Sequence, residues 1–177
     1  MNKNIALPRF AAIAAVAMLA LTGCSTATTP SSPDAAPAGD TVTITDAWVK
    51  ATDESMSAAF GTLDNSGAGD VTIVSATTDA AGMVELHETV ENESGEMVMR
   101  EIEGGFSIPA GGDLLLEPGA NHIMLMDLAG PLAAGDEVDV TLTFSDDSTY
   151  TFTAPVKDYS GANENYEGGD EHEGMDH

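Results

Sequence analysis

Between Thr41 and about Lys157 the chain alternates short apolar runs with turn-forming residues. Runs rich in Val, Ile, Thr, Phe and Leu are separated by Gly, Asp, Asn and Pro at the spacing of strands, and no segment keeps a helical period over three turns. The pattern predicts strands near 41–50, 57–64, 70–78, 83–90, 97–103, 113–117, 122–128, 136–145 and 149–156. We therefore expect a single all-β domain over 41–157, a β-sandwich or barrel with enough chain to close a core.

The segments on either side of this domain have different compositions. Residues 24–40 are rich in Ser, Thr, Pro and Ala and lack apolar periodicity, which is typical of a flexible tether. Residues 158–177 are acidic, Gly-rich and nearly free of aliphatic side chains, so they cannot bury enough surface to order themselves. We expect a disordered tail there.

The first residues predict a lipoprotein signal peptide over 1–23. Lys3 and Arg9 precede an apolar run, 10–21, that is too short to span a bilayer. The run ends in Leu-Thr-Gly-Cys, the kind of sequence cleaved before a lipidated cysteine, so Cys24 is expected to begin the mature chain. The sequence therefore predicts a protein secreted across the cytoplasmic membrane and held at its outer face by a lipid anchor, in the cell envelope or periplasm.

Cysteine usage and charge narrow the chemistry of the domain. Cys24 is the only cysteine, so the mature domain has neither a disulfide nor a free thiol. The net charge of −25 becomes −27 once residues 1–23 are removed, because they hold two of the five basic residues and none of the thirty acidic ones. Such a surface disfavours nucleic acid and anionic lipid headgroups and attracts cations.

Strand alternation predicts which side chains share a face, because successive residues point to opposite sides of a sheet. Leu86, Val98 and Ile123 represent the apolar faces of three predicted strands. The opposite, polar faces hold two histidines and five methionines: His87, His122, Met83, Met97, Met99, Met124 and Met126. A single methionine is ordinarily a core filler, but the repeated pairing of sulfur with imidazole favours a ligand set.

Thioether sulfur and imidazole together favour copper(I) over zinc, calcium or magnesium. Both ligand types are neutral, so two of each leave copper(I) its single positive charge. They disfavour copper(II), which prefers tetragonal nitrogen and oxygen ligands. Replacing His122 or Met124 is accordingly expected to remove copper(I) affinity with little effect on stability.

The segments VELHE, MVMRE, IPAGGDLLLEPG and HIMLMDL resemble those of the periplasmic copper chaperones of the PCu(A)C type, over roughly residues 41–156. The resemblance implies a cupredoxin-like β-sandwich or Greek-key barrel with copper(I) ligands His87, Met99, His122 and Met124. Eleven residues separate His87 from Met99 and twenty-two separate Met99 from His122, each one more than in the family's common pattern. Met97 therefore stays an alternative to Met99.

Further metal ligands are possible outside this set. Met97 and Met126 share the predicted polar faces, and the tail holds His172, Met175 and His177 among acids. Some members of the resembled family carry His/Met-rich extensions, which implies an auxiliary site here, suited to copper(II). The alternative is a solvated acidic tail.

The resemblance implies a monomeric copper chaperone that delivers copper(I) to a respiratory acceptor, such as the CuA centre of cytochrome c oxidase or a Sco-type protein. Two alternatives stay open: a lipoprotein that sequesters copper for storage or resistance, and a structural lipoprotein that binds no metal. A blue-copper electron carrier is excluded because the domain lacks the cysteine such a site needs. No catalytic motif stands out, so an enzyme is not expected.

Overall fold

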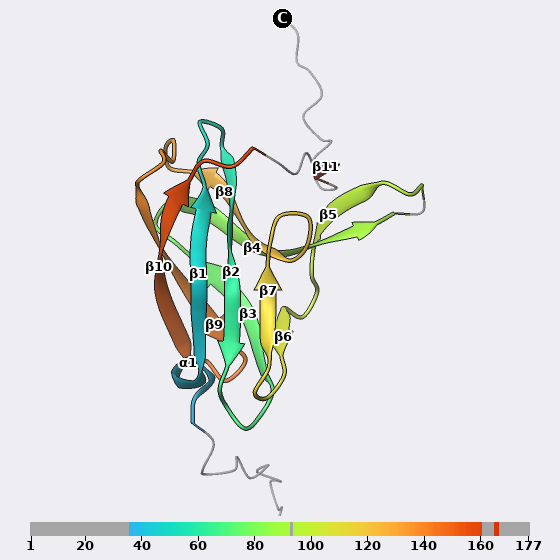
Figure 1. Ribbon diagram of the computed structural model, residues 1–177, viewed down its shortest axis with the longest axis vertical. Helices are drawn as coiled ribbons and strands as arrows, with labels where there is room; N and C mark the ends of the chain where they lie inside the picture. Colours follow the sequence, from blue (N-terminus) through green and yellow to red (C-terminus); the bar gives the residue numbers. More distant parts are fainter. Residues whose placement is uncertain (1–35, 93, 161–164, 167–177) are drawn as a thin grey trace, which may run out of the picture. The chain divides into compact units, whose positions relative to one another are not determined.

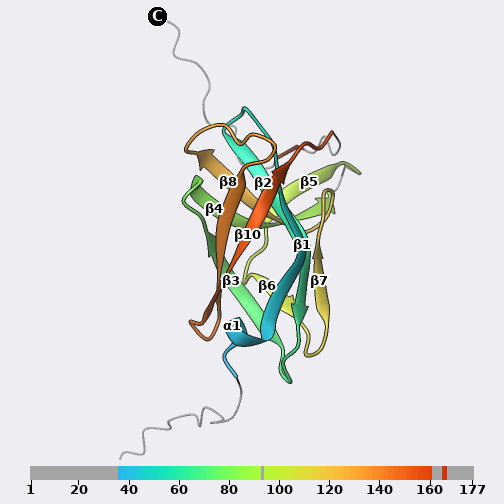
Figure 2. The ribbon, with the colours of Figure 1, turned by 60° about the vertical axis from the view of Figure 1, so that its left-hand side comes forward.

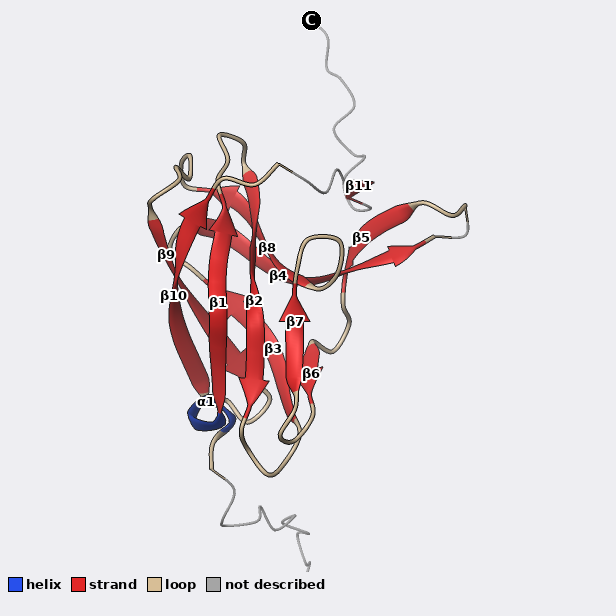
Figure 3. Cartoon of the chain, viewed as in Figure 1, coloured by secondary structure: helices blue, strands red, loops and turns tan. Residues whose placement is uncertain are grey.

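The computed structural model describes residues 36–92, 94–160 and 165–166, and these are built almost wholly from strands (Figure 1, Figure 3). The strands are β1 (Val42–Lys50), β2 (Met56–Asn65), β3 (Val71–Thr77), β4 (Ala81–Glu91), β5 (Met97–Glu101), β6 (Phe106–Ile108), β7 (Asp113–Leu116), β8 (His122–Leu128), β9 (Glu137–Phe144), β10 (Thr149–Lys157) and β11 (Asn165–Tyr166). The all-β prediction is confirmed.

Three short elements were not predicted. The helix α1 (Ala38–Thr41) falls within the segment expected to be a tether, β6 follows β5 after a turn, and β11 lies within the expected tail. Four residues are too few to show a helical period, and two or three are too few to show alternation. Among the described residues, no helix combines the length and apolar character that crossing a bilayer requires.

The strands form two layers that pack face to face (Figure 2). One contains β5-β4-β8-β2-β1 with β11 beside β5 and β7 paired to β2, and the other contains β10-β9-β3-β6. The layers are joined where β1 and β10 pair in parallel, Val49 opposite Val156 and Lys50 opposite Lys157. Apart from the parallel β11–β5 pair, the remaining paired strands are antiparallel.

The core lies between the layers and follows from alternation in the sequence. In β9, Val138 and Val140 are buried whereas Glu137 and Asp139 are exposed. Residues such as Leu63, Leu86, Ile123 and Leu125 fill the core from the other layer. Each such side chain stabilises the fold by about 1.5 to 3 kcal/mol when fully buried, which offsets the entropy of ordering the chain.

The strands β4, β8 and β2 lie side by side in fixed register. Leu86 of β4 is opposite Ile123 of β8, and Ala59 of β2 is opposite the same Ile123; all three belong to the core. The next residue on each strand therefore points away from the core. We call this side of β2, β4, β5 and β8 the outer face.

Aromatic side chains cover part of the outer face beside β2. The β1–β2 register shifts between Thr45 and Trp48, and Asp46 there has a φ of 53°. After this irregularity the Trp48 ring lies 4.5 Å from the Phe60 ring and 5.4 Å from that of Tyr159. The outer face is thus partly apolar and partly enclosed at this point.

Candidate metal centre

His87 and His122 lie directly opposite each other on β4 and β8, on the outer face. Their ring centroids are 5.5 Å apart and the ring planes meet at 73°. Both residues are almost fully buried, with exposed fractions of 0% and 2%. The sequence predicted the shared face but expected it to be polar; Phe60, Met99 and Met124 lie around His122 there.

The separation of the two rings suits a shared metal ion. An ion bound to a ring nitrogen at about 2.0 to 2.1 Å lies about 3 Å from the ring centroid. Two imidazoles that hold one ion therefore have centroids no more than about 6 Å apart. The observed 5.5 Å falls within this limit.

The protein fixes which nitrogen of His122 is available. Nδ1 is 2.9 Å from the backbone carbonyl oxygen of Ala120, an acceptor, so Nδ1 carries the proton and donates it. Nε2 then holds the lone pair, and it is buried without a hydrogen-bond partner among the described residues. A buried acceptor left in this state costs about 1 to 3 kcal/mol, so the arrangement calls for a ligand.

The surroundings also keep the His122 ring neutral. Burial lowers the pKa of His122 below its usual value, the hydrogen bond to Ala120 raises it, and the neighbouring His87 lowers it again. The net pKa is lowered, so the lone pair on Nε2 stays available to lower pH than in an exposed histidine.

His87 is oriented by a carboxylate. Its Nε2 is 2.8 Å from Oε2 of Glu85, two residues earlier on the same face of β4. When Nε2 donates its proton to this carboxylate, the lone pair of the neutral ring resides on Nδ1. A carboxylate behind an imidazole is a common outer partner of metal-binding histidines, because it fixes the ring and raises its basicity.

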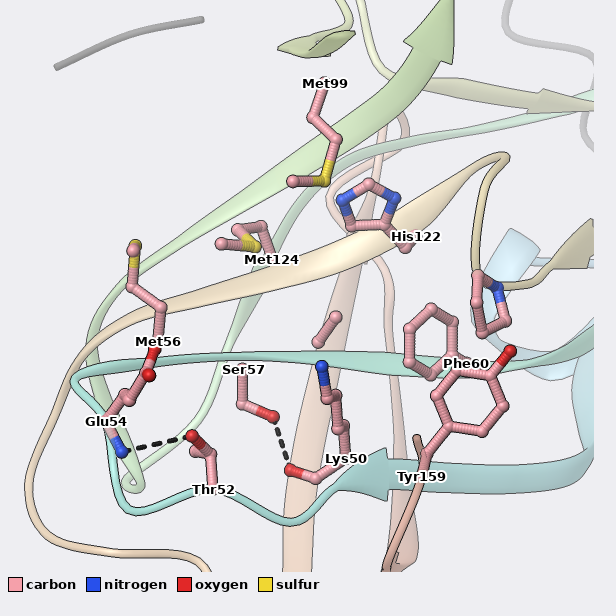
Figure 4. A pocket seen from close by; sticks show the side chains of 12 residues that line it. Lys50, Thr52, Glu54, Met56, Ser57, Phe60, Met99, His122, Met124 and Tyr159 are labelled. Atoms are coloured by element: carbon pink, nitrogen blue, oxygen red, sulfur yellow. Dashed lines mark hydrogen bonds between the residues drawn. The ribbon is translucent and has the colours of Figure 1, made fainter. Parts of the chain in front are cut away.

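Two thioethers join His122 around one cavity of about 200 Å³ (Figure 4). Met124 comes from β8 and Met99 from β5, and Figure 4 shows both side chains next to the His122 ring. The remaining lining residues include Lys50, Thr52, Glu54, Met56, Phe60 and Tyr159. His87 adjoins His122 in the sheet and is not part of the cavity wall.

The structure separates the two methionines of β5 that the sequence left as alternatives. Met99 lies opposite Thr89 and lines the cavity. Met97 lies opposite Glu91, further along β5, and 48% of it is exposed. Of the two methionines of β5, only Met99 lines the cavity together with His122.

The other predicted site residues lie elsewhere. Met126 is buried on β8, two residues beyond Met124. Cys24, His172, Met175 and His177 are outside the described residues. Met56, Lys50 and Phe60 also adjoin the site, and they were not predicted from the sequence. Met56 could have been included, because it directly precedes a predicted strand and is a further methionine.

The donors gathered at this candidate site are imidazoles and thioethers. Within the described ranges no group of three or more His, Cys, Asp or Glu side chains is placed to hold a metal ion. The structure instead brings thioether sulfur beside imidazole. This composition is that of a site for a soft metal ion.

The fold is that of the PCuAC domains, which confirms the resemblance seen in the sequence. The copper-bound PCuAC domain from PmoF2 is similar with a TM-score of 0.56 at 18% identity, over 71% of this chain and 99% of that one, a likeness of fold. The solution structure of Cu(I)-DR1885 from Deinococcus radiodurans is similar with a TM-score of 0.52 at 29% identity, over 67% of this chain and 80% of that one.

The sequence identifies the family to which the chain belongs. Residues 42–156 match the family described as "Putative lipoprotein LpqE-like", and the chain belongs to this family. A "Putative lipoprotein" from Leifsonia xyli subsp. xyli is 53% identical over 129 residues, which cover 73% of this chain and 77% of that protein.

Proposed function

We propose that this protein is an extracytoplasmic, monomeric copper(I) chaperone, anchored through lipid on Cys24, that binds one copper(I) ion through His87, Met99, His122 and Met124. The observation that carries the proposal is Nε2 of His122: a buried lone pair with no hydrogen-bond partner among the described residues, beside the thioethers of Met99 and Met124. The copper named in the solved relatives supports the choice of ion.

The four side chains suit the reduced ion. Neutral imidazoles and thioethers leave a monovalent ion its single charge, which is less costly to bury than the double charge of copper(II). Hard ions prefer carboxylate and carbonyl oxygens, and the carboxylate of Glu85 is already directed at His87. The site is therefore expected to hold copper in the reduced state.

Replacement of the Met99 sulfur best explains how the ion is released. This residue is only partly buried and lies on β5, whereas Met124 and the two histidines are almost fully buried on central strands. An acceptor's thiolate or thioether would replace the Met99 sulfur first and draw the ion out by ligand exchange, with no change in oxidation state. Met97 takes no part in this proposal.

A titration of copper(I) against a chromophoric competitor tests the site. One tight equivalent is expected, and Met99→Leu should weaken its affinity at least tenfold, because one of four ligands is lost at nearly constant volume. Met97→Leu is the matched control on the same strand and should bind as the wild type does. Equal affinities of the Met99→Leu variant and the wild type would remove Met99 from the site, and absence of any tight equivalent would refute the proposal.

Delivery is the proposed fate of the ion, to a respiratory acceptor such as the CuA centre of cytochrome c oxidase or a Sco-type protein. Incubating the copper(I)-loaded protein with the apo acceptor domain, followed by separation and metal analysis, should show copper on the acceptor. Retention of copper by a fully loaded donor would instead support sequestration. The tail residues His172, Met175 and His177 are proposed as an auxiliary site for copper(II).

A further inference from the structure

We propose that the outer face holds a second copper(I) site made of three thioethers, Met56, Met126 and Met83, which receives the ion and passes it to the site above. We call these three residues the methionine row. The inference concerns a different set of side chains from the proposed chaperone site, although it rests on that proposal for the destination of the ion.

The register of the sheet places the three residues side by side. Met126 of β8 is directly opposite Met83 of β4 on one side and directly opposite Met56 of β2 on the other. Directly opposed residues of antiparallel strands point to the same face with Cβ atoms about 4.5 to 5.5 Å apart. Three flexible thioether side chains in such a row can therefore turn their sulfurs toward one ion.

The methionine row is accessible from solvent. Met126 is 5% exposed, but its two neighbours in the row are 40% exposed for Met56 and 45% exposed for Met83. Met56 and Met83 are therefore open to solvent on either side of the buried Met126, so an ion in solution can reach their sulfurs. Thioethers half open to solvent suit the capture of a soft ion.

The methionine row is continuous with the proposed chaperone site. Met126 and Met124 are two residues apart on β8, about 6.6 Å along the strand, and both belong to the outer face. Met56 lines the same cavity as Met124, Met99 and His122, and Figure 4 shows Met56 and Met124 together on that wall. An ion can therefore move from the row to the histidines by exchanging one thioether for the next.

Three neutral thioethers without imidazole give the row a distinct chemistry. It suits copper(I) and its redox-silent analogue silver(I), but neither copper(II) nor zinc. Its ligands do not titrate, whereas imidazoles lose metal affinity as they protonate near pH 6.5. Binding at the row should therefore change less than twofold between pH 7.5 and 5.5, while binding at His172 and His177 should fall.

The test is a silver(I) and copper(I) titration of the full chain labelled with carbon-13 at the methionine methyl groups. The first equivalent should shift the Met99 and Met124 resonances, and the second should shift those of Met56, Met83 and Met126. In a Met83→Leu variant the second event at Met126 should weaken at least tenfold while the first stays unchanged. Met97→Leu, an equally exposed methionine outside the row, is the control.

The outcomes separate the two proposals. A second equivalent that shifts only Met175, or that binds the Met83→Leu variant as tightly as the wild type, overturns the methionine row and leaves the chaperone site intact. A first equivalent that shifts the row and leaves Met99 and Met124 unmoved overturns the chaperone site and leaves the row. Retention of the first equivalent in the Met83→Leu variant shows that the variant is folded.

Discussion

The burial of His122 has a consequence for the stability of the metal-free protein. Its pKa is lowered in the fold, chiefly by burial, relative to the ordinary value of 6.5. The unfolded chain therefore binds a proton at a higher pH than the folded one does, and stability falls as the pH drops below 6.5 toward the lowered pKa. Above 6.5 this contribution is fully present.

Urea unfolding of the apo protein between pH 7.5 and 5 measures this effect. We expect the free energy of unfolding to decrease on acidification through that window and His122→Asn to flatten the decrease. A wild-type profile that is level there, or a variant with the same slope, would assign the pH dependence to other groups.

Substitutions can separate the packing of Met124 from its proposed role as a ligand. It is 6% exposed, so the sequence-based expectation that its replacement hardly affects stability is revised. Met124→Leu keeps the volume and should cost less than about 1.5 kcal/mol, whereas Met124→Ala should cost about 2 to 5 kcal/mol. Both remove the thioether and should lower copper(I) affinity at least tenfold. Unchanged affinity of the leucine variant would show that Met124 only packs.

At the scale of elements, the irregularity in β1 is followed by Trp48, whose fluorescence can report on metal binding. Trp48 is the only tryptophan, its ring lies 4.5 Å from that of Phe60, and Phe60 lies 6.3 Å from the His122 ring. Copper(I) bound at His122 should change the tryptophan emission up to one equivalent, and Phe60→Leu should reduce the change. An emission that does not respond to copper(I) would place the ion away from this aromatic wall.

The turn between β5 and β6 depends on two glycines with different surroundings. Gly105 has a φ of 81° and a Cβ added there would overlap the carbonyl oxygen of Ile73, so the backbone of β3 must shift. Gly104 has a φ of 88° but open space around it. Gly104→Ala should cost about 1 to 2 kcal/mol for the left-handed conformation alone, and Gly105→Ala clearly more. Equal losses in chemical unfolding would contradict this explanation.

Strand alternation explains how much of the fold the sequence predicts. Runs such as 136–145, with one apolar residue in every two, are present as expected, and the opposite face of β8 does gather His122, Met124 and Met126. Alternation is a local property, so it could not predict which strands become neighbours. The placement of His87 opposite His122, and of Met56 beside Met126, arises from long-range pairing.

Burial of the site was the main feature that alternation could not predict. The sequence assigned a polar face to β4 and β8, because histidine and glutamate occur there. Part of the cover comes from Phe60, which precedes His122 by more than sixty residues in the chain and comes beside it only through the β2–β8 pairing. Met99 could not be separated from Met97 for the same reason, since both share one side of a single strand.

At the scale of the whole molecule, the net charge of −25 opposes the compact state. Salt screens this repulsion, with a Debye length of about 30 Å at 0.01 M and about 8 Å at 0.15 M. The melting temperature of the apo protein should therefore rise by several degrees between those concentrations of NaCl, measured by circular dichroism. A melting temperature that falls with salt would show that attractive ion pairs outweigh the repulsion.

The helix α1 is fastened at one end of the domain, where the backbone amides of Ala38 and Gly39 donate to Asp146 and Ser148 in the β9–β10 turn. β1 starts directly after α1 and reaches the cavity at Lys50, so its nine residues separate the two by about 26 Å. Anything attached through the segment before Ala36 enters at that far end. The cavity is therefore at the end of the domain away from Ala38, so a partner that covers Lys50 leaves α1 and the β9–β10 turn uncovered.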